Sequence, residues 1–387
     1  MRKRIGIDCL FAVPGKTWGT WVFAKNLLEE ITALDSENTY VIFLTPTAAA
    51  NFPLGRPNVV VVKCRLAGLS IGARLAHQNL LLPLLAKFHR LALLHSLGNY
   101  GPVLPLVRSV VTVHDMLPFF SARQRQDSTP SFRAGALDLV MRRSLSRAHA
   151  ITTVSEFTRQ QLILRYPFTS TKIRVVYGGY PPHKWTLPHD VQGVFRKYGI
   201  RAPFLLSVRL WPPHKNIERL IQAFARLKIE SGIPHQLVLV GTAEPNHQSL
   251  LNLVAAAGLK TEVVFTGTVS DAELAGLYAA ADLFVCPSLM EGFGLPLLEA
   301  MANQTPVVCS NSGPLPEIAG DAALMFDPLS IEDMARAIGK VLGDPALRLR
   351  LVDRGLKRLE QFSFRRAAEQ MLQLYEEVIR PGRRNSA

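Results

Sequence analysis

Two carboxylates and a glycine-containing loop lie close together in the carboxyl-terminal half of the sequence. Glu291 precedes Gly292 and Gly294, and Glu299 follows a few residues later. A helix is predicted to begin near Leu295. The exposed N–H groups and the dipole of a helix start suit an anion. Carboxylates accept hydrogen bonds from hydroxyl groups. Two acids beside an anion site therefore predict a ligand with both phosphate and hydroxyl groups, for which a sugar nucleotide is the obvious candidate.

The residues around this loop are typical of a strand, a loop and a helix in succession. The segment 281–286, which is apolar apart from Asp282, predicts a short buried strand, which Pro287 ends. Pro296 stands in the first helical turn, where a missing N–H does no harm. We therefore expect the loop to leave the carboxyl end of a strand in a parallel sheet.

Two cations form a second candidate site in the same half. Arg209 follows the predicted strand 204–208, and Lys215 stands just before the predicted helix 217–228. An arginine fork and a lysine point charge at one strand end make a plausible diphosphate clamp. Isolated basic residues are more often solvated surface, but the pairing with the glycine loop favours a functional interpretation.

In the amino-terminal half, polar side chains also follow predicted strands. His114 comes directly after the strand 109–113, and we favour a site role over a purely structural one. His95 and Asn99 follow the predicted strand 91–94, and their loop position alone makes them candidates to face an acceptor. Ser155 is predicted to cap a helix that begins at Glu156.

Strands alternate with helices along the whole chain, which is typical of doubly wound parallel sheets. At 387 residues the chain is long for one core, so two domains are expected. The segment 177–183 is rich in glycine and proline and is the predicted boundary. Ligands of such sheets bind outside the carboxyl ends of the strands, so we expect a cleft between the two domains.

Several motifs together resemble glycosyltransferase family four, whose members are retaining enzymes with the two-domain GT-B fold. The order of the motifs fits throughout the chain, and the match runs in register through most of the carboxyl-terminal half. The motifs are Arg209, Lys215–Asn216, Phe265–Gly267, Glu291–Pro296, Glu299–Ala302 and Leu315–Ala323. The two glutamates with seven residues between them are the hallmark of the family.

The resemblance implies an α/β architecture of two Rossmann-like domains that face a central cleft. Residues 1–180 would form the acceptor-binding domain and residues 181–362 the nucleotide-sugar-binding domain. Residues 363–387 would contribute a helix that crosses back to the amino-terminal domain, followed by a tail.

The resemblance also implies roles for single residues in the carboxyl-terminal half. Arg209 and Lys215 would bind the donor diphosphate. Glu291 would hold hydroxyls of the transferred sugar, and Glu299 would accept from the ribose. The amides of Gly292, Phe293, Gly294 and Leu295 would contact the sugar or the phosphates.

Further family positions match less tightly. Gly241 and Val269 would line the nucleotide base, although the usual second glycine after Gly241 is absent. His114 would reach the donor sugar across the cleft. Gly19 would let the backbone approach the donor from the first strand-helix loop, although the usual glycine pair is reduced there.

The donor and the acceptor follow from the resemblance to bacterial mannosyltransferases of surface polysaccharide assembly. GDP-mannose is the favoured donor, and UDP-sugars stay open. No obligatory metal is expected, because the expected loop has no Asp-x-Asp element. The acceptor would be a saccharide or a lipid-linked saccharide. The enzyme would be cytoplasmic, with a peripheral contact at the inner face of the plasma membrane left open.

Composition limits the alternatives. The formal net charge is +14, yet the basic residues are dispersed and accompany no nucleic-acid-binding signature. An anionic membrane surface or a phosphorylated ligand is better supported. The apolar stretch 79–98 fits either a membrane interface or a core helix with a polar edge. The amino terminus shows neither a signal peptide nor a spanning helix. The four cysteines lack metal-site spacing and are expected to be buried thiols.

Rival functions stay open at this point. One is a GT-B relative that epimerises or hydrolyses a sugar nucleotide. Another is a non-catalytic basic binding protein that merely retains the fold. A dehydrogenase is disfavoured, because no predicted strand is followed by G-x-G-x-x-G.

Overall fold

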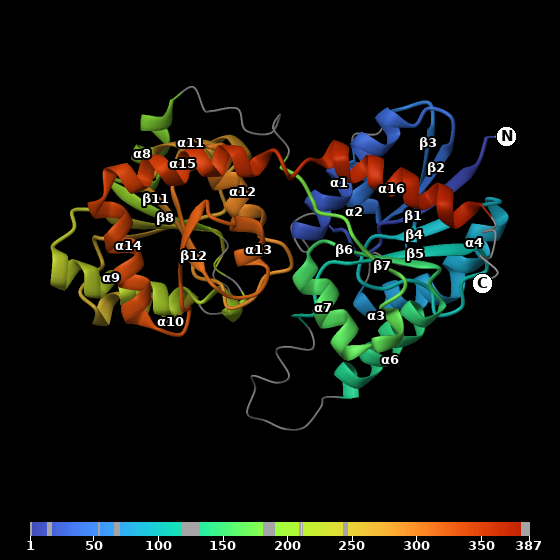
Figure 1. Cartoon of the computed structure of the whole chain (residues 1–387), viewed down its shortest axis with the longest axis horizontal. Helices are drawn as coiled ribbons and strands as arrows, with labels where there is room; N and C mark the ends of the chain where they lie inside the picture. Colours follow the sequence, from blue (N-terminus) through green and yellow to red (C-terminus); the bar gives the residue numbers. More distant parts are fainter. Residues whose placement is uncertain are drawn as a thin grey trace. The chain divides into compact units, whose positions relative to one another are not determined.

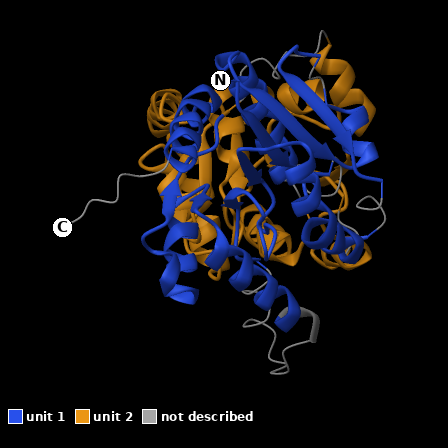
Figure 2. Cartoon of the chain, turned by 90° about the vertical axis from the view of Figure 1, so that its right-hand side faces the viewer, with its two compact units in different colours: residues 1–179, 363–387 blue, residues 180–362 orange. Residues whose placement is uncertain are grey.

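A computed structural model describes residues 2–13, 18–52, 55–65, 70–117, 132–180, 190–208, 210, 212–242 and 247–380. The chain divides into two compact units, coloured separately in Figure 2. Unit 1 comprises residues 1–179 and 363–387, and unit 2 comprises residues 180–362. Each unit is built around one parallel sheet with helices packed against it (Figure 1). The predicted α/β class with two parallel-sheet domains is confirmed.

The sheet of unit 1 has seven strands in the order β3-β2-β1-β4-β5-β6-β7. Its central strands are buried along their length, as expected for a sheet covered on both faces. The strands are β1 (Arg4–Asp8), β2 (Thr39–Leu44), β3 (Val59–Lys63), β4 (Leu93–Ser96), β5 (Arg108–Val113), β6 (Ala150–Thr153) and β7 (Ile173–Val175).

The helices of unit 1 include the carboxyl-terminal helix, which packs on α1 and contacts β4 and β5. Phe364 at its start lies against Phe23 of α1, with ring centroids 6.0 Å apart. The helical segments are α1 (Trp18–Leu34), α2 (Pro46–Ala50), α3 (Ile71–Ala76), the π-helix η2 (His77–Leu81), α4 (Leu82–Phe88), α6 (Phe132–Arg147), α7 (Glu156–Arg165), the 3₁₀ turn η3 (Pro167–Thr169) and α16 (Phe364–Ile379).

The sheet of unit 2 has six strands in the order β10-β9-β8-β11-β12-β13. Its strands are β8 (Phe204–Val208), β9 (Gln236–Val240), β10 (Val263–Gly267), β11 (Leu283–Cys286), β12 (Val307–Ser310) and β13 (Ala323–Phe326). Its helical segments are α8 (Val191–Tyr198), η5 (Pro213–Lys215), α9 (Ile217–Ser231), α10 (His247–Ala256), α11 (Asp271–Ala280), α12 (Leu295–Ala302), α13 (Leu315–Ala319), α14 (Ile331–Gly343) and α15 (Pro345–Leu359).

Three expectations about local structure need correction. Gly19 was expected in the first strand-helix loop, but α1 begins at Trp18, so Gly19 lies in a helical turn. The fourth strand extends through Ser96, so His95 is inside β4 and not in a loop. The stretch 79–98 is not one helix, because it divides into η2, α4 and β4.

Candidate active site

The order of strands in unit 2 reverses between β8 and β11. From β8 the chain builds outward through β9 to β10, and it then returns to the other side of β8 to form β11. In an open parallel sheet, the loops on either side of such a reversal diverge and leave room for a ligand. The two segments predicted to carry chemistry, η5 after β8 and residues 287–294 after β11, both leave the sheet at this point.

Lys215 and Glu291 meet at this reversal. Lys215 Nζ donates to Glu291 Oε1 over 2.6 Å, and the two side chains are only 10% and 12% exposed. The neighbouring His214 has a lowered pKa because it is largely desolvated and lies near the Lys215 charge. The structure therefore brings together a cation and a carboxylate that the sequence separates widely, in a site with little access to water.

The carboxylate of Glu291 has a second partner that the sequence did not predict. Ser288 Oγ donates to the same oxygen, Oε1, over 2.7 Å. The Ser288 carbonyl in turn accepts from Ser310 Oγ at the end of β12, and Ser312 Oγ donates to the Leu289 carbonyl over 2.7 Å. Serines of the neighbouring strand end thus hold the loop that presents Glu291. The only available signal was the position of Ser288 three residues before the acid.

Asn216 fixes the two loops to one another. Its backbone is left-handed, with φ near 61°, and its buried side-chain amide donates to the carbonyls of Pro287 and Pro328. The Leu289 amide also donates to the His214 carbonyl over 2.7 Å. Asparagine tolerates the left-handed conformation better than most residues. Asn216 therefore holds Lys215 and the Glu291 loop in register.

The predicted helix start is present at Leu295. Gly294 precedes α12 with φ near 112°, and no side chain caps the helix there. A Cβ on Gly294 would lie 3.0 Å from Leu315 Cδ2, so both the backbone angle and the packing favour glycine. Pro296 occupies the first turn, as expected. The first amides of this eight-residue helix lack a side-chain acceptor, which suits an anion.

Glu299 lies inside α12 and is buried, in contrast to an ordinary solvated helix carboxylate. Tyr278 of α11 donates its hydroxyl to Glu299 Oε2 over 3.0 Å. Burial raises the pKa of the Tyr180 phenol, and the nearby Glu299 charge raises it further. The surroundings of Glu299 are consistent with a carboxylate held ready to accept hydrogen bonds.

The residues expected to line a nucleotide base lie at the same edge of the sheet. Gly241, with φ near 121°, donates its amide to the Gly267 carbonyl over 2.9 Å where β9 and β10 end. Val269, two residues later, is half-buried. Gly292 and Phe293 are half-buried, and the Phe293 ring lies against Phe362. Arg209, the predicted partner of Lys215 on the diphosphate, lies outside the described residues.

In unit 1, His114 follows β5 as predicted and is buried and neutral. Its Nε2 donates to the Leu97 carbonyl over 2.8 Å, and its ring packs edge-on against Phe23. Burial lowers the pKa of His114 to about 4. Asn99 Oδ1 accepts from the His114 amide over 2.6 Å, and Asn99 itself is left-handed. The imidazole is thus a fixed, uncharged group just beyond the end of its strand.

The expectation that His95 faces an acceptor is wrong. His95 is fully buried in β4, between the Tyr375 hydroxyl at 2.6 Å and Thr112 Oγ1 at 2.7 Å. Burial lowers its pKa to about 3. It therefore ties α16 to the sheet. Ser155 does cap α7, because its Oγ accepts from the Thr158 amide.

A buried carboxylate at the strand reversal of unit 1 was not singled out from the sequence. Asp8 ends β1, and its Oδ2 accepts from Gln78 Nε2 at 2.6 Å and from Ser96 Oγ at 2.9 Å. Burial raises the pKa of Asp8, whereas these hydrogen bonds oppose the rise. Gln78 also donates to the Tyr100 carbonyl, so this network joins β1, η2 and the segment after β4.

Comparison with known proteins assigns the family. The family model "Glycosyltransferase Family 4" matches residues 19–184, and "Glycosyl transferases group 1" matches residues 194–358. The chain is 33% identical over 276 residues to the O-antigen chain mannosyltransferase B of Escherichia coli, covering 70% of this chain and 71% of that protein. The chain belongs to glycosyltransferase family four. It is accordingly a hexosyltransferase.

Other relatives and solved structures are similar to this glycosyltransferase. The serotype-specific mannosyltransferase WbdA of Escherichia coli is 29% identical over 285 residues, which are 72% of this chain but 35% of that longer protein. A sucrose-phosphate synthase from Thermosynechococcus elongatus has a TM-score of 0.77 at 22% identity, covering 97% of this chain and 99% of its own. Anabaena HepE in complex with UDP has a TM-score of 0.72 at 20% identity, covering 97% and 100%. Both structures share the fold.

Within the described part of the glycosyltransferase, no cluster of histidine, cysteine or acidic residues could hold a metal ion. All four cysteines are buried thiols, as predicted. None of the described helices is long and apolar enough to cross a membrane.

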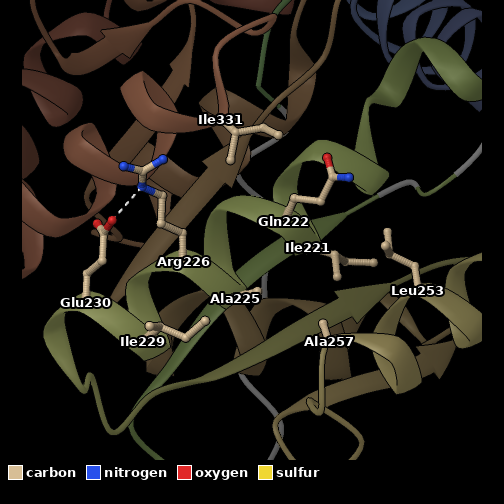
Figure 3. Close-up of a pocket in the computed structure, with 9 residues that line it drawn as sticks. All are labelled: Ile221, Gln222, Ala225, Arg226, Ile229, Glu230, Leu253, Ala257 and Ile331. Carbon is tan, nitrogen blue, oxygen red and sulfur yellow. Dashed lines mark ion pairs between the residues drawn. The ribbon is translucent and has the colours of Figure 1, made fainter.

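A hollow in unit 2 lies apart from the residues described above. It is formed by α9, α10 and the start of α14, and its lining is mostly apolar (Figure 3). Arg226 and Glu230, which also line it, form an ion pair with Nε and Oε1 2.8 Å apart. None of the predicted site residues lines it. The candidate active site of the glycosyltransferase is therefore assigned by the loops after β8 and β11 and not by this hollow.

Proposed function

We propose that the enzyme transfers a hexose, with mannose favoured, from a nucleotide sugar to a saccharide or lipid-linked acceptor in surface polysaccharide assembly. GDP-mannose is the favoured donor. The names of the related O-antigen mannosyltransferases support the sugar, whereas the UDP held by Anabaena HepE keeps a uridine donor in view. The observation that carries the proposal is the contact between Lys215 and Glu291 at the strand reversal of unit 2.

We assign the donor diphosphate to Lys215, to Arg209 and to the open amides at the start of α12. The lysine is held in a nearly dry site, where its charge acts on a phosphate far more strongly than at the surface. Glu291 pairs with Lys215 in this structure. In the donor, the sugar is bonded to the diphosphate, so a diphosphate on Lys215 would bring the sugar to the Glu291 carboxylate. Glu299, held by Tyr278, would accept from the ribose hydroxyls. Gly241 and Val269 would border the base.

We infer transfer with retention of the anomeric configuration. The bond between the anomeric carbon and the diphosphate oxygen breaks, and the acceptor oxygen bonds to that carbon on the same face. The acceptor proton passes to the departing phosphate, so no separate protein base is required. Lys215, Arg209 and the α12 amides would stabilise the negative charge that develops on the leaving group. Binding of both substrates would align the two reacting atoms. His114, neutral by burial, would contact the sugar as a hydrogen-bonding group and not as a cation.

The experiment that tests this function begins with ligand-induced stabilisation. GDP, UDP, ADP and their sugars are added separately, and the Tm of the full chain is measured. Selective stabilisation by a nucleoside diphosphate is expected, by RT ln(1 + [L]/Kd). Product analysis with GDP-mannose, with and without a lipid-linked saccharide, then separates transfer from hydrolysis or epimerisation. Release of free mannose without an acceptor at the transfer rate would contradict the proposal. A contact with anionic membrane belongs to the same proposal, because a lipid-linked acceptor lies at a membrane surface.

A further inference from the structure

Three large apolar side chains line the outer side of η2 and α4 in unit 1. Leu80, Leu84 and Phe88 are 68%, 59% and 79% exposed. They are spaced four residues apart, so they form one stripe along the segment. We propose that this stripe is a docking surface for an anionic phospholipid bilayer. The proposal gives the membrane contact suggested above a defined place and does not depend on the donor chemistry.

The inner side of the same segment is also apolar, and it is already packed against the core of unit 1. Leu82 and Ala86 are fully buried and pack in one cluster with Leu91 and Phe43. A surface helix normally carries polar residues on the side away from the core. Here both sides are apolar, and stability of unit 1 alone does not explain the outer one. Such an exposed apolar surface is typical of an interaction site.

A neighbouring loop enlarges this surface. The Val103 amide donates to Asn79 Oδ1 over 2.9 Å, which fixes the segment 103–106 beside η2. Leu104 and Leu106 of that segment are also exposed. The apolar residues therefore form a patch from two separate parts of the chain and not a single protruding side chain. Leu81 is exposed as well, and we call the six residues Leu80, Leu81, Leu84, Phe88, Leu104 and Leu106 the α4 patch.

The charges around the α4 patch favour an anionic partner. Lys87 and Arg90 are exposed within the same segment, and Arg4 is close enough to help lower the pKa of His89, after burial. No aspartate or glutamate occurs in the sequence between Glu37 and Asp115.

The acids of the helix that packs on this sheet do not offset this positive charge. Each of the three glutamates of α16 pairs with an arginine: Glu369 with Arg365 at 3.4 Å, Glu376 with Arg380 at 3.2 Å, and Glu377 with Arg174.

The combination of exposed apolar side chains and positive charge favours a bilayer over a second copy of the chain. A second copy of the chain would bring two basic patches together, which is unfavourable. An anionic bilayer offers lipid tails to the leucines and phenylalanine and head-group phosphates to the lysine and arginines. The segment is too short to span a bilayer, so contact in the interface is the arrangement that fits.

The test is vesicle co-sedimentation of the full chain without any nucleotide. Vesicles of phosphatidylcholine alone are compared with vesicles that contain phosphatidylglycerol. Wild-type protein should bind the anionic vesicles and bind the neutral ones far more weakly. The Leu84→Ser/Phe88→Ser variant should bind the anionic vesicles at least about tenfold more weakly. Replacing Lys87 and Arg90 by Gln should weaken binding about fivefold for each charge.

A matched control removes two equally exposed apolar side chains elsewhere. Leu164 and Leu349 are each 74% exposed and lie on α7 and α15, so Leu164→Ser/Leu349→Ser should bind as the wild type does. The Tm of every variant is compared with that of the wild type to establish folding. The proposal is overturned if wild-type protein ignores anionic vesicles, or if the α4-patch variant binds them as well as the control does. It is also overturned if the wild type dimerises through this patch, with dimerisation lost in the α4-patch variant. Because no donor is present, any of these results would leave the proposed sugar transfer intact.

Discussion

Lys215 Nζ lies 2.6 Å from Glu291 Oε1, at the point where the strand order of unit 2 reverses. Taking two charges out of water is costly, and a buried pair often adds little net stability over an apolar pair of the same size. A buried ion pair at a strand reversal, where ligands of parallel sheets bind, is therefore explained better by a role in binding than by stability. A diphosphate bound here would accept hydrogen bonds from Lys215 beside Glu291 or in its place.

The first prediction concerns the charge left behind when Glu291 is removed. Glu291→Ala leaves Lys215 without its carboxylate partner in a nearly dry site, so the free energy of unfolding should fall by about 2 kcal/mol. GDP supplies a replacement negative charge, so it should raise the Tm of Glu291→Ala by more than it raises that of the wild type. In Lys215→Ala the GDP effect should shrink. Equal GDP-induced shifts in all three proteins would contradict a diphosphate role for Lys215.

Ser288 should act as a positioning residue for the Glu291 carboxylate. Ser288→Ala removes the hydrogen bond to Oε1 and should lower kcat about tenfold, as expected for the loss of one bond to a charged group. GDP binding, measured by thermal shift, should hardly change, because the diphosphate is assigned to other groups. Ser312→Ala is the comparison, because that side chain supports the loop through the Leu289 carbonyl and does not contact the carboxylate, so it should lower kcat less than Ser288→Ala does. A parallel loss of GDP binding in Ser288→Ala would assign the serine to the nucleotide instead.

Glu299 should distinguish ribose from deoxyribose. If the carboxylate accepts from ribose hydroxyls, the wild type should bind GDP more tightly than 2′,3′-dideoxy-GDP, and Glu299→Ala should abolish this preference. Tyr278→Phe should weaken the preference less, because it removes only the hydroxyl that holds Oε2. Calorimetric titration of both nucleotides with each variant checks this. A preference that survives Glu299→Ala would place the ribose elsewhere.

The buried histidines of unit 1 make stability depend on pH. Folding lowers the pKa of His114 to about 4 and that of His95 to about 3, both through burial. As the pH falls, these histidines therefore bind protons in the unfolded chain before they do so in the folded one. Their contribution to the free energy of unfolding is complete above the ordinary histidine pKa near 6.5 and decreases as the pH drops below it. Each histidine should account for a loss on the order of 2 kcal/mol between pH 8 and pH 5. Urea unfolding of the wild type and of His114→Asn measures this, and the variant should lose less stability over that range. An identical pH dependence in the two proteins would show that His114 titrates normally.

Much of the site in unit 2 could be predicted from local signals. Pro296 and Gly294 indicate where α12 begins, and the apolar run before Pro287 indicates where β11 ends. The two loops that carry Lys215 and Glu291 were expected at strand ends, and parallel strands bring such ends to one edge. These signals depend on a few neighbouring residues, which is why sequence alone reveals them.

The contacts that were missed depend on residues far apart in the chain. Ser288 was not predicted as a site residue, because its role depends on Ser310, which donates to its carbonyl from the next strand. The position of His95 was predicted wrongly because an apolar run does not show where strand pairing stops. β4 continues through His95 and Ser96, which pair with β1 and β5 on either side. For residues 79–98, the expectation of a core element holds for the inner side of α4, whereas the outer side is exposed and its contact with a membrane stays a proposal.

The most direct test of the central claim is transfer of mannose from saturating GDP-mannose to a lipid-linked saccharide by wild-type, Lys215→Ala and Glu291→Ala proteins. Circular dichroism and Tm establish that each variant is folded. The account predicts that both variants lose at least about a hundredfold in kcat, because the charge on the leaving diphosphate and the position of the sugar are no longer supported. Turnover close to that of the wild type in either folded variant would contradict the assignment of this site.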